Sequence, residues 1–130
     1  VLYIEDNPVN LMVAQQLMER WPAVRLLHAE NGEEGLVHVR TSDRIDLLLL
    51  DMQLPDMDGI AVLHRLREDA KTCEVPVVVL SASAMETEVR KALEAGALDY
   101  WTKPLDFQQF LEGVRGYLAR AAACDSDRVA

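Results

Sequence analysis

Five short apolar runs alternate with longer segments of helical period along this chain of 130 residues. The runs lack the polar alternation of half-exposed strands, so they are typical of strands buried on both faces, as in a parallel sheet covered by helices. Alternating β and α units joined by right-handed crossovers build such a sheet. We therefore predict an α/β, doubly wound parallel sheet. The five runs are Val1–Ile4, Val24–His28, Ile45–Leu50, Val75–Leu80 and, more weakly, Ala97–Trp101.

The segments between the runs carry helix start and stop signals. Asn7 is a favourable N-cap with Pro8 at the first helical position, and Pro22 is expected to end that first helix. Gly96 is expected to end the fourth helix. Half of the residues are apolar, which suits one self-supporting domain over residues 1–122, with a frayed tail over residues 123–130. The expected helices span residues 8–21, 31–40, 60–67, 84–95 and 106–122.

Charge and composition exclude several classes of function. The chain has 13 basic and 22 acidic residues, a net charge of −9, and no basic run longer than a dipeptide, so no direct nucleic-acid partner is expected. No apolar stretch approaches the roughly 20 residues of a membrane span, so no membrane span is expected in this segment. Cys73 and Cys124 lack neighbours at metal-ligand spacing and are typical of free thiols in a reducing, cytoplasmic compartment.

Reactive side chains follow four of the five predicted strands. Glu5 and Asp6 follow the first strand, Asp51 the third, Ser81 the fourth and Lys103 the fifth. In an open parallel sheet these positions meet at one edge, which is where ligands bind. Clustered carboxylates raise one another's pKa unless a hard divalent cation holds them ionised. Mg²⁺ is the natural choice, because it binds carboxylates, keeps waters and accepts a phosphate oxygen.

A cation beside a carboxylate and a lysine predicts phosphoryl chemistry. The cation and Lys103 would offset charge on a phosphoryl group while an oxygen of Asp51, on the central strand, attacks phosphorus. Each of the reactive residues taken singly is as readily a helix cap, a turn residue or a solvated loop residue. The prediction therefore depends on their convergence at one edge.

Four longer motifs stand in order along the chain. They are Tyr-Ile-Glu-Asp-Asn-Pro-Val-Asn from residue 3, Leu-Leu-Leu-Asp-Met-Gln-Leu-Pro-Asp-Met-Asp-Gly from residue 48, Val-Leu-Ser-Ala-Ser-Ala from residue 79, and Ala-Gly-Ala-Leu-Asp-Tyr-Trp-Thr-Lys-Pro-Leu from residue 95. Together they resemble the receiver domain of two-component response regulators, from Val1 to about Leu118. The resemblance implies a flavodoxin-like (βα)5 fold with strand order 2-1-3-4-5. It also implies a signalling switch with weak autophosphatase chemistry rather than an enzyme that turns over a small substrate.

The resemblance further implies how a phosphoryl group is accepted. Asp51 would receive it from a phosphohistidine of a histidine kinase or histidine phosphotransfer domain. Asp6, Asp51 and the backbone carbonyl of Gln53 would hold Mg²⁺, and Glu5 would act through a metal-bound water.

The remaining family positions concern the switch. Lys103 would pair with the phosphoryl oxygens and Ser81 would donate a hydrogen bond to one of them. Tyr100 matches the aromatic residue that turns inward when Ser81 moves, and the bond between Lys103 and Pro104 is expected to be cis.

Particular residues argue against two related functions. A phosphatase of the haloacid-dehalogenase type needs a second acid where this chain has Gln53, and a flavodoxin needs a Ser/Thr-rich phosphate loop after the first strand. A stand-alone single-domain regulator is compatible with the motifs, as is a pseudo-receiver that is never phosphorylated.

The parent protein is expected to be larger than this segment. The chain opens inside a strand, and its Glu-Asp-Asn-Pro-Val-Asn motif is most similar to receivers fused to sensor kinases. We therefore expect the C-terminal receiver of a bacterial hybrid sensor histidine kinase, whose parent could be attached to a membrane. The residues predict neither the oligomeric state nor the cognate kinase, the input signal or the downstream output.

Overall fold

The computed structural model describes residues 1–19, 25–41, 45–70, 72–82, 85–102 and 107–129, without the side chains of 107 and 120–129. Within these residues, five parallel strands form one sheet in the order β2-β1-β3-β4-β5. This is the predicted strand order. The strands are β1 (Leu2–Ile4), β2 (Leu27–Ala29), β3 (Leu48–Asp51), β4 (Val77–Ser81) and β5 (Asp99–Thr102). The helices are α1 (Pro8–Met18), α2 (Gly32–Thr41), α3 (Gly59–Glu68), α4 (Glu86–Glu94) and α5 (Phe107–Val129).

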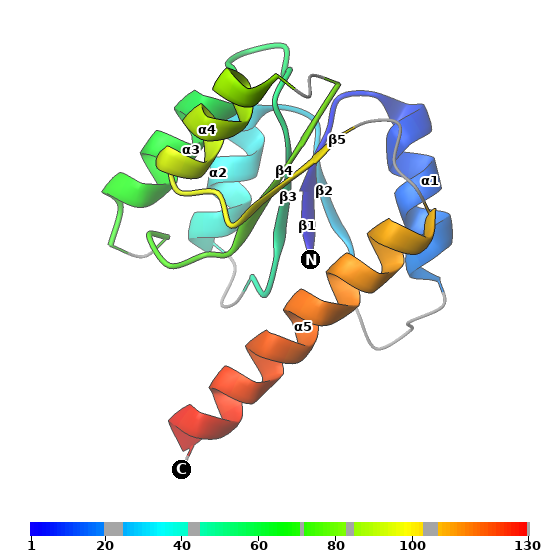
Figure 1. Cartoon of the computed structure of the whole chain (residues 1–130), viewed down its shortest axis with the longest axis vertical. Helices are drawn as coiled ribbons and strands as arrows, with labels where there is room; N and C mark the ends of the chain where they lie inside the picture. The colour runs from blue at the N-terminus through cyan, green and yellow to red at the C-terminus, as the bar shows by residue number, and fades with distance from the viewer. Residues whose placement is uncertain (20–24, 42–44, 71, 83–84, 103–106, 130) are drawn as a thin grey trace.

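The sheet is covered on both faces (Figure 1). Helices α2, α3 and α4 lie on one side of it, and α1 and α5 lie on the other. Successive residues of a strand point to opposite faces, so each strand contributes to two cores. Leu2, Ile4 and Val79 belong to the core beneath α2, α3 and α4. Tyr3 and Leu80 belong to the core beneath α1 and α5. Burial on both faces explains why the strands read as unbroken apolar runs.

Two of the predicted helix boundary signals, Asn7 and Gly96, are present, whereas Asp106, the predicted cap of the last helix, lies outside the described residues. Asn7 is the N-cap of α1 and accepts a hydrogen bond from the Val9 amide at 2.9 Å, with Pro8 as the first helical residue. The Asn31 side chain accepts from the Glu34 amide at 2.8 Å at the start of α2. Gly96, with φ of +114°, follows α4 as expected of a glycine after a helix C-terminus.

The α5 helix is longer than the sequence analysis predicts. It continues past residue 122 to Val129, where a frayed tail is expected from Ala123. Alanine has the highest helix propensity, and no Gly or Pro follows Gly116, so nothing in the local sequence ends the helix near residue 122. Figure 1 shows this C-terminal part extending beyond the sheet. The boundary of the domain at residue 122 remains a prediction.

All five strands begin one to three residues later than the predicted apolar runs. β3 begins at Leu48 and β4 at Val77, although the apolar runs begin at Ile45 and Val75. Burial and membership of a strand are different properties: Leu47 is fully buried, and Ile45 and Val75 are partly buried, yet none of them belongs to a strand. The first helix ends at Met18, with Glu19 as its C-cap, which is earlier than the predicted end at Trp21; Trp21 and Pro22 themselves lie outside the described residues.

Trp101 fixes α5 against the sheet. Its ring packs edge-on against Phe110, with the ring centroids 6.2 Å apart, and its indole nitrogen donates to Asp99 at 3.1 Å. The Tyr117 hydroxyl donates to the same Asp99 oxygen at 3.1 Å. Trp101 therefore faces α5, opposite to Tyr100, as strand alternation predicts.

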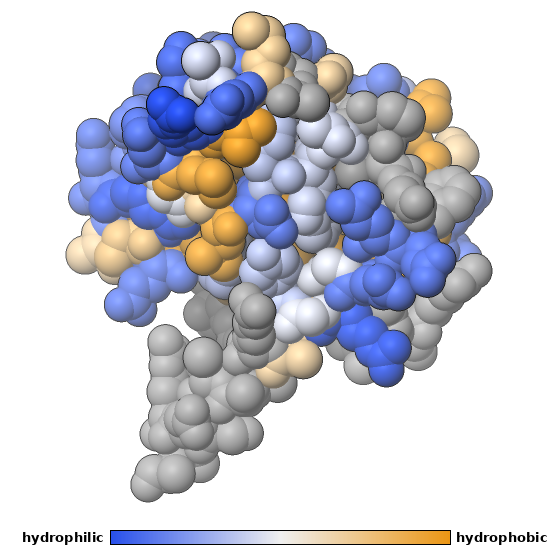
Figure 2. Space-filling model, viewed as in Figure 1, coloured by the Kyte–Doolittle hydropathy of each residue, from blue (hydrophilic) through white to orange (hydrophobic). Residues whose placement is uncertain are grey.

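The surface of the molecule is largely polar on the face seen in Figure 2. Apolar side chains gather there where α4 meets the start of β5, and Leu93 and Leu98 are 44% and 54% exposed. Among the described helices, none has the length and hydropathy needed to span a bilayer.

Candidate functional site

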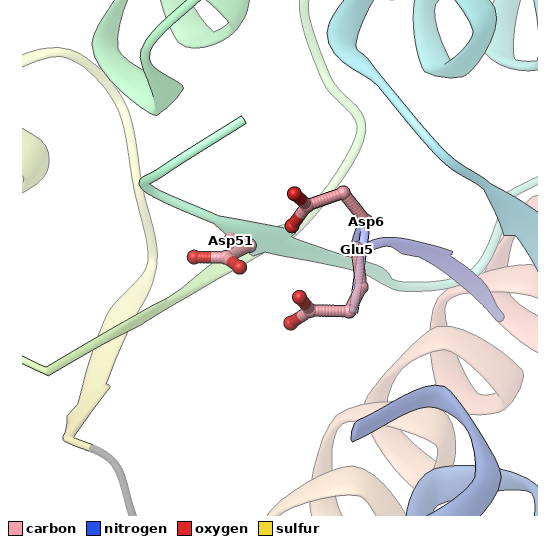
Figure 3. A group of neighbouring side chains, drawn as sticks. All are labelled: Glu5, Asp6 and Asp51. Atoms are coloured by element: carbon pink, nitrogen blue, oxygen red, sulfur yellow. The ribbon is translucent and has the colours of Figure 1, made fainter. Parts of the chain in front are cut away.

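Three carboxylates meet at the carboxyl edge of the sheet (Figure 3). Glu5 and Asp6 follow β1, and Asp51 is the last residue of β3. Each offers one oxygen, and these oxygens all lie within 4.8 Å of one another. Asp6 is exposed, whereas Glu5 and Asp51 are only 1% and 5% exposed. The structure thus brings together the three acidic residues that the sequence analysis places at this edge.

The strand register explains the convergence. Ile4 pairs with Leu50, so the residues that follow them, Glu5 and Asp51, stand side by side on neighbouring strands. Asp51 in turn pairs with Leu80, which directly precedes Ser81. A register shift of one residue would turn each of these side chains to the other face of the sheet.

Glu5 is held by hydrogen bonds to both of its carboxylate oxygens. The Asn7 amide donates to Oε1 at 3.1 Å, and the Tyr3 hydroxyl donates to Oε2 at 3.1 Å. Burial first, and then the adjacent Glu5 carboxylate, raise the pKa of Tyr3 far above its ordinary value. The Tyr3 hydroxyl therefore stays protonated and acts as a donor to Glu5.

The loop after β3 is folded back on itself. The Gln53 amide donates to Asp51 Oδ1 at 3.1 Å, and Gln53 forms a bridge with Asp58. A Cβ on Gly59 would lie 2.9 Å from the Met52 Cα, so only glycine permits this close approach. The side chain of Gln53 is exposed.

The donor set suits a hard divalent cation. Mg²⁺ binds oxygen at about 2.0–2.1 Å, so two oxygens on the same ion are separated by roughly 3–4 Å. The separations of up to 4.8 Å are close to this range. Three carboxylates at such distances repel one another, and a cation between them removes that cost. Glu5, Asp6 and Asp51 are therefore able to hold Mg²⁺ after a small inward adjustment.

The predicted switch residues occupy the neighbouring strands. Ser81 ends β4 and is 9% exposed, and it pairs with Thr102 on β5. Tyr100 is partly buried and packs on the core beneath α2, α3 and α4. Since Tyr100 pairs with Val79, two residues before Ser81, Ser81 and Tyr100 belong to the same face of the sheet. Lys103 and Pro104 lie outside the described residues, so the position of the lysine and the cis bond stay predictions.

Two residues around the site are absent from the sequence analysis. One is Tyr3, whose hydroxyl contacts Glu5. The other is His28, which pairs with Tyr3 across the strands and whose Nε2 lies 2.8 Å from the Glu5 carbonyl oxygen. For Tyr3 the available signal is a polar atom within an otherwise apolar strand, two residues before a candidate ligand.

Comparison with known proteins places the chain in a family. A family model described as the response regulator receiver domain matches residues 1–115. The chain belongs to the response regulator receiver family. The resemblance in the sequence and the flavodoxin-like fold are both confirmed.

Its relatives include proteins of different architecture. The chain is 31% identical over 121 residues to the polar-differentiation response regulator DivK of Brucella anthropi, and the match covers 93% of this chain and 97% of DivK. It is 36% identical over 117 residues to the sensor histidine kinase GacS of Pseudomonas protegens. That match covers 88% of this chain but only 12% of GacS. Receiver domains of this type therefore occur both alone and as parts of much longer kinases.

A solved receiver structure bears on the acidic site. The receiver domain of sensor histidine kinase PA1611 from Pseudomonas aeruginosa has a magnesium ion coordinated in its active site cleft. The two structures have a TM-score of 0.80 at 26% sequence identity, and the match covers 91% of this chain and 95% of that one. This chain is thus a receiver domain of two-component signalling with an acidic cluster at the strand edge.

Proposed function

We propose that this receiver accepts a phosphoryl group on Asp51 from a phosphohistidine of a histidine kinase or a histidine phosphotransfer domain. The observation that carries the proposal is the position of Asp51. Asp51 is only 5% exposed and ends the central strand, and a carboxylate oxygen of Asp51 has oxygens of Glu5 and Asp6 within 4.8 Å. A nucleophile needs this combination of fixed position and adjacent charge compensation.

The chemistry is a direct transfer between two nucleophiles. A carboxylate oxygen of Asp51 attacks phosphorus, the bond between phosphorus and the imidazole nitrogen breaks, and the electron pair of that bond stays with the imidazole. The Gln53 amide, which donates to Asp51 Oδ1, orients the carboxylate for attack by its other oxygen. Bound Mg²⁺ would supply charge compensation for the phosphoryl oxygens; Asp6, Asp51 and the Gln53 carbonyl would hold it directly, and Glu5 would contribute through a water.

The proposed response to phosphorylation involves residues on β4 and β5, the strands that follow β3 in the sheet. Ser81 would donate a hydrogen bond to a phosphoryl oxygen, and Lys103 would pair with another. Tyr100 lies on the same sheet face as Ser81, so a displacement of Ser81 would open space toward its ring. This arrangement supports Tyr100 as the residue that reports the state of Asp51.

The parent protein is proposed to be a bacterial hybrid sensor histidine kinase with this receiver at its C-terminus. The similarity to GacS and to the PA1611 receiver supports this context. The similarity to DivK supports the alternative of a stand-alone regulator, since nearly all of DivK is matched. In either context we propose a cytoplasmic location for the domain.

Mass spectrometry of the intact protein tests the proposal. Phosphoramidate serves as donor because it carries the nitrogen–phosphorus bond of a phosphohistidine. The chain should gain one phosphoryl group in the presence of Mg²⁺, and Asp51→Asn should abolish the gain. Asp56→Asn is the matched control, because Asp56 lies in the same loop but binds the backbone of α2.

The outcomes separate the candidate functions. Labelling of Asp56→Asn but not of Asp51→Asn supports Asp51 as the acceptor. Equal labelling of Asp51→Asn and the natural sequence would remove Asp51 from this role. Absence of labelling from every folded sample with Mg²⁺ would favour a pseudo-receiver.

A further inference from the structure

Tyr3 is a buried residue whose only polar side-chain atom reaches the acidic cluster. It lies in the middle of β1, between β2 and β3, and pairs with His28 on one side and Leu49 on the other. Its ring is 1% exposed and belongs to the core beneath α1 and α5. Packing on all sides therefore fixes the place of its hydroxyl.

The hydroxyl and Glu5 are arranged by strand geometry. Tyr3 and Glu5 are two residues apart, so their side chains emerge on the same face of the sheet. The hydroxyl donates to Glu5 Oε2 at 3.1 Å, in a buried environment. The Asn7 amide holds the other oxygen, Oε1, at 3.1 Å. The carboxylate is thus restrained from two directions, one set by the backbone and one by a side chain.

A restrained Glu5 has a specific advantage in this cluster. A glutamate side chain has one more rotatable bond than an aspartate, so without restraint it samples more positions. Glu5 lies in one cluster with Asp6 and Asp51, where one oxygen of each residue lies within 4.8 Å of the others. Groups that orient a ligand from outside the coordination sphere typically change metal affinity by about 10–100-fold.

We infer that the Tyr3 hydroxyl is a positioning group for the cation site: it holds the Glu5 carboxylate in the orientation in which Glu5, Asp6 and Asp51 bind Mg²⁺ together. This inference rests on the proposed function, because it concerns the same acidic cluster. It assigns to a core residue a contribution to cation affinity that is separate from its contribution to packing.

The test compares two substitutions that each remove one hydroxyl. Tyr3→Phe keeps the ring and its packing, and removes only the donor to Glu5. Tyr117→Phe is the matched control, because it removes a hydroxyl that donates to Asp99 at 3.1 Å; Asp99 begins β5, whereas the cluster lies at the carboxyl ends of the strands. Mg²⁺ alone is titrated into the full chain, and the backbone amide signal of Gln53 is followed by NMR. The same spectra show whether each variant is folded.

We expect Tyr3→Phe to raise the Kd for Mg²⁺ about tenfold, the lower end of the range for orienting groups, and Tyr117→Phe to leave it unchanged. A Kd for folded Tyr3→Phe within twofold of the natural sequence would overturn the inference, as would an equal change in Tyr117→Phe.

The same substitution made in a Glu5→Asp variant tests whether the effect of Tyr3→Phe depends on Glu5. In Glu5→Asp the carboxylate is one methylene shorter and no longer reaches the Tyr3 hydroxyl. Adding Tyr3→Phe to this variant should leave its Kd for Mg²⁺ unchanged. A further tenfold rise in Kd would show that Tyr3→Phe acts through packing rather than through Glu5.

Phosphorylation kinetics provide a separate measurement. With phosphoramidate as donor, Tyr3→Phe should raise the Mg²⁺ concentration for half-maximal rate about tenfold and leave the rate at saturating Mg²⁺ unchanged. If the chain is not phosphorylated but the NMR titrations differ as expected, the proposed function fails and the positioning role of Tyr3 stands.

Discussion

Arg67 should contribute strongly to stability although it lies far from the acidic cluster. Its guanidinium donates three hydrogen bonds to backbone carbonyls, to Cys73 and Val75 at 2.8 Å each and to Gly96 at 2.6 Å. It thereby ties the end of α3 to the segment that leads into β4 and to the turn between α4 and β5. Partial burial lowers the pKa of the Arg67 guanidinium, but an arginine stays charged throughout the accessible pH range.

The expected cost of Arg67→Met follows from these contacts. Methionine keeps most of the aliphatic stem, so the loss is mainly the hydrogen bonds. The bonds to Val75 and Gly96 are partly buried, and a hydrogen bond to a charged group contributes about 1.5–3 kcal/mol. The bond to Cys73 is exposed and contributes little. If each of the two partly buried bonds contributes about 1.5 kcal/mol, the lower limit of this range, Arg67→Met should lower the free energy of unfolding by about 3 kcal/mol.

Urea denaturation followed by circular dichroism measures this loss. Arg65→Met is the matched control on the same helix, since its ion pair with Glu33, at 2.6 Å, joins side chains that are 49% and 61% exposed. Exposed pairs of this kind are worth about 0–1 kcal/mol. Arg67→Lys should recover less than half of the loss, because an ammonium group cannot reproduce the planar fork. A loss below about 1 kcal/mol for Arg67→Met, at equal denaturant slope, would refute this reasoning.

Two further predictions concern carboxylates. Burial opposes the shift, but backbone amides of Gly32 and Glu33 lower the pKa of Asp56, so its stabilising contacts with α2 are present at neutral pH and lost as pH falls through that lowered pKa. Asp56→Asn should therefore lower Tm slightly at pH 7, and this difference in Tm should disappear as the pH falls through that lowered pKa. A Tm difference that is constant with pH would contradict this. Asp6→Asn should raise Tm without Mg²⁺, because it removes one of three clustered charges, and should lose the Tm increase that saturating Mg²⁺ gives the natural sequence. Equal Mg²⁺ responses of the two proteins would exclude Asp6 as a ligand.

The features that could be predicted from the sequence are those with local signals. Asn7 with Pro8 marks a helix start through backbone preferences within a few residues. The apolar runs mark the strands, and the carboxylates that follow them are placed at one edge by the general behaviour of parallel sheets. The order of the strands follows from the family resemblance, since periodicity alone does not determine which strands are neighbours.

The features that could not be predicted depend on contacts between distant segments. Arg67 and Gly96 are 29 residues apart, and Asp56 binds an amide 24 residues away. No periodicity links such positions, because the crossover connections bring them together only in the folded chain. Tyr3 and Glu5 are close in sequence, yet a tyrosine in an apolar strand is first interpreted as core. The predicted first residues of the strands are also inexact, because where a strand begins depends on pairing with the neighbouring strand rather than on the apolar run alone.

The acidic residues and the proposed switch residues of the site lie on opposite faces of the sheet. By strand alternation Asp51 belongs to the same face as Leu49, and Glu5 to the same face as Tyr3, over the core beneath α1 and α5. Ser81 and Tyr100 belong to the opposite face, over which α4 lies. Among the described residues, the two groups approach each other where Asp51 pairs with Leu80 at the end of β4, one residue before Ser81. A phosphoryl group accepted on Asp51, as proposed, would therefore lie beside the end of β4, where the Ser81 hydroxyl would be the nearest group of the α4 side to contact it.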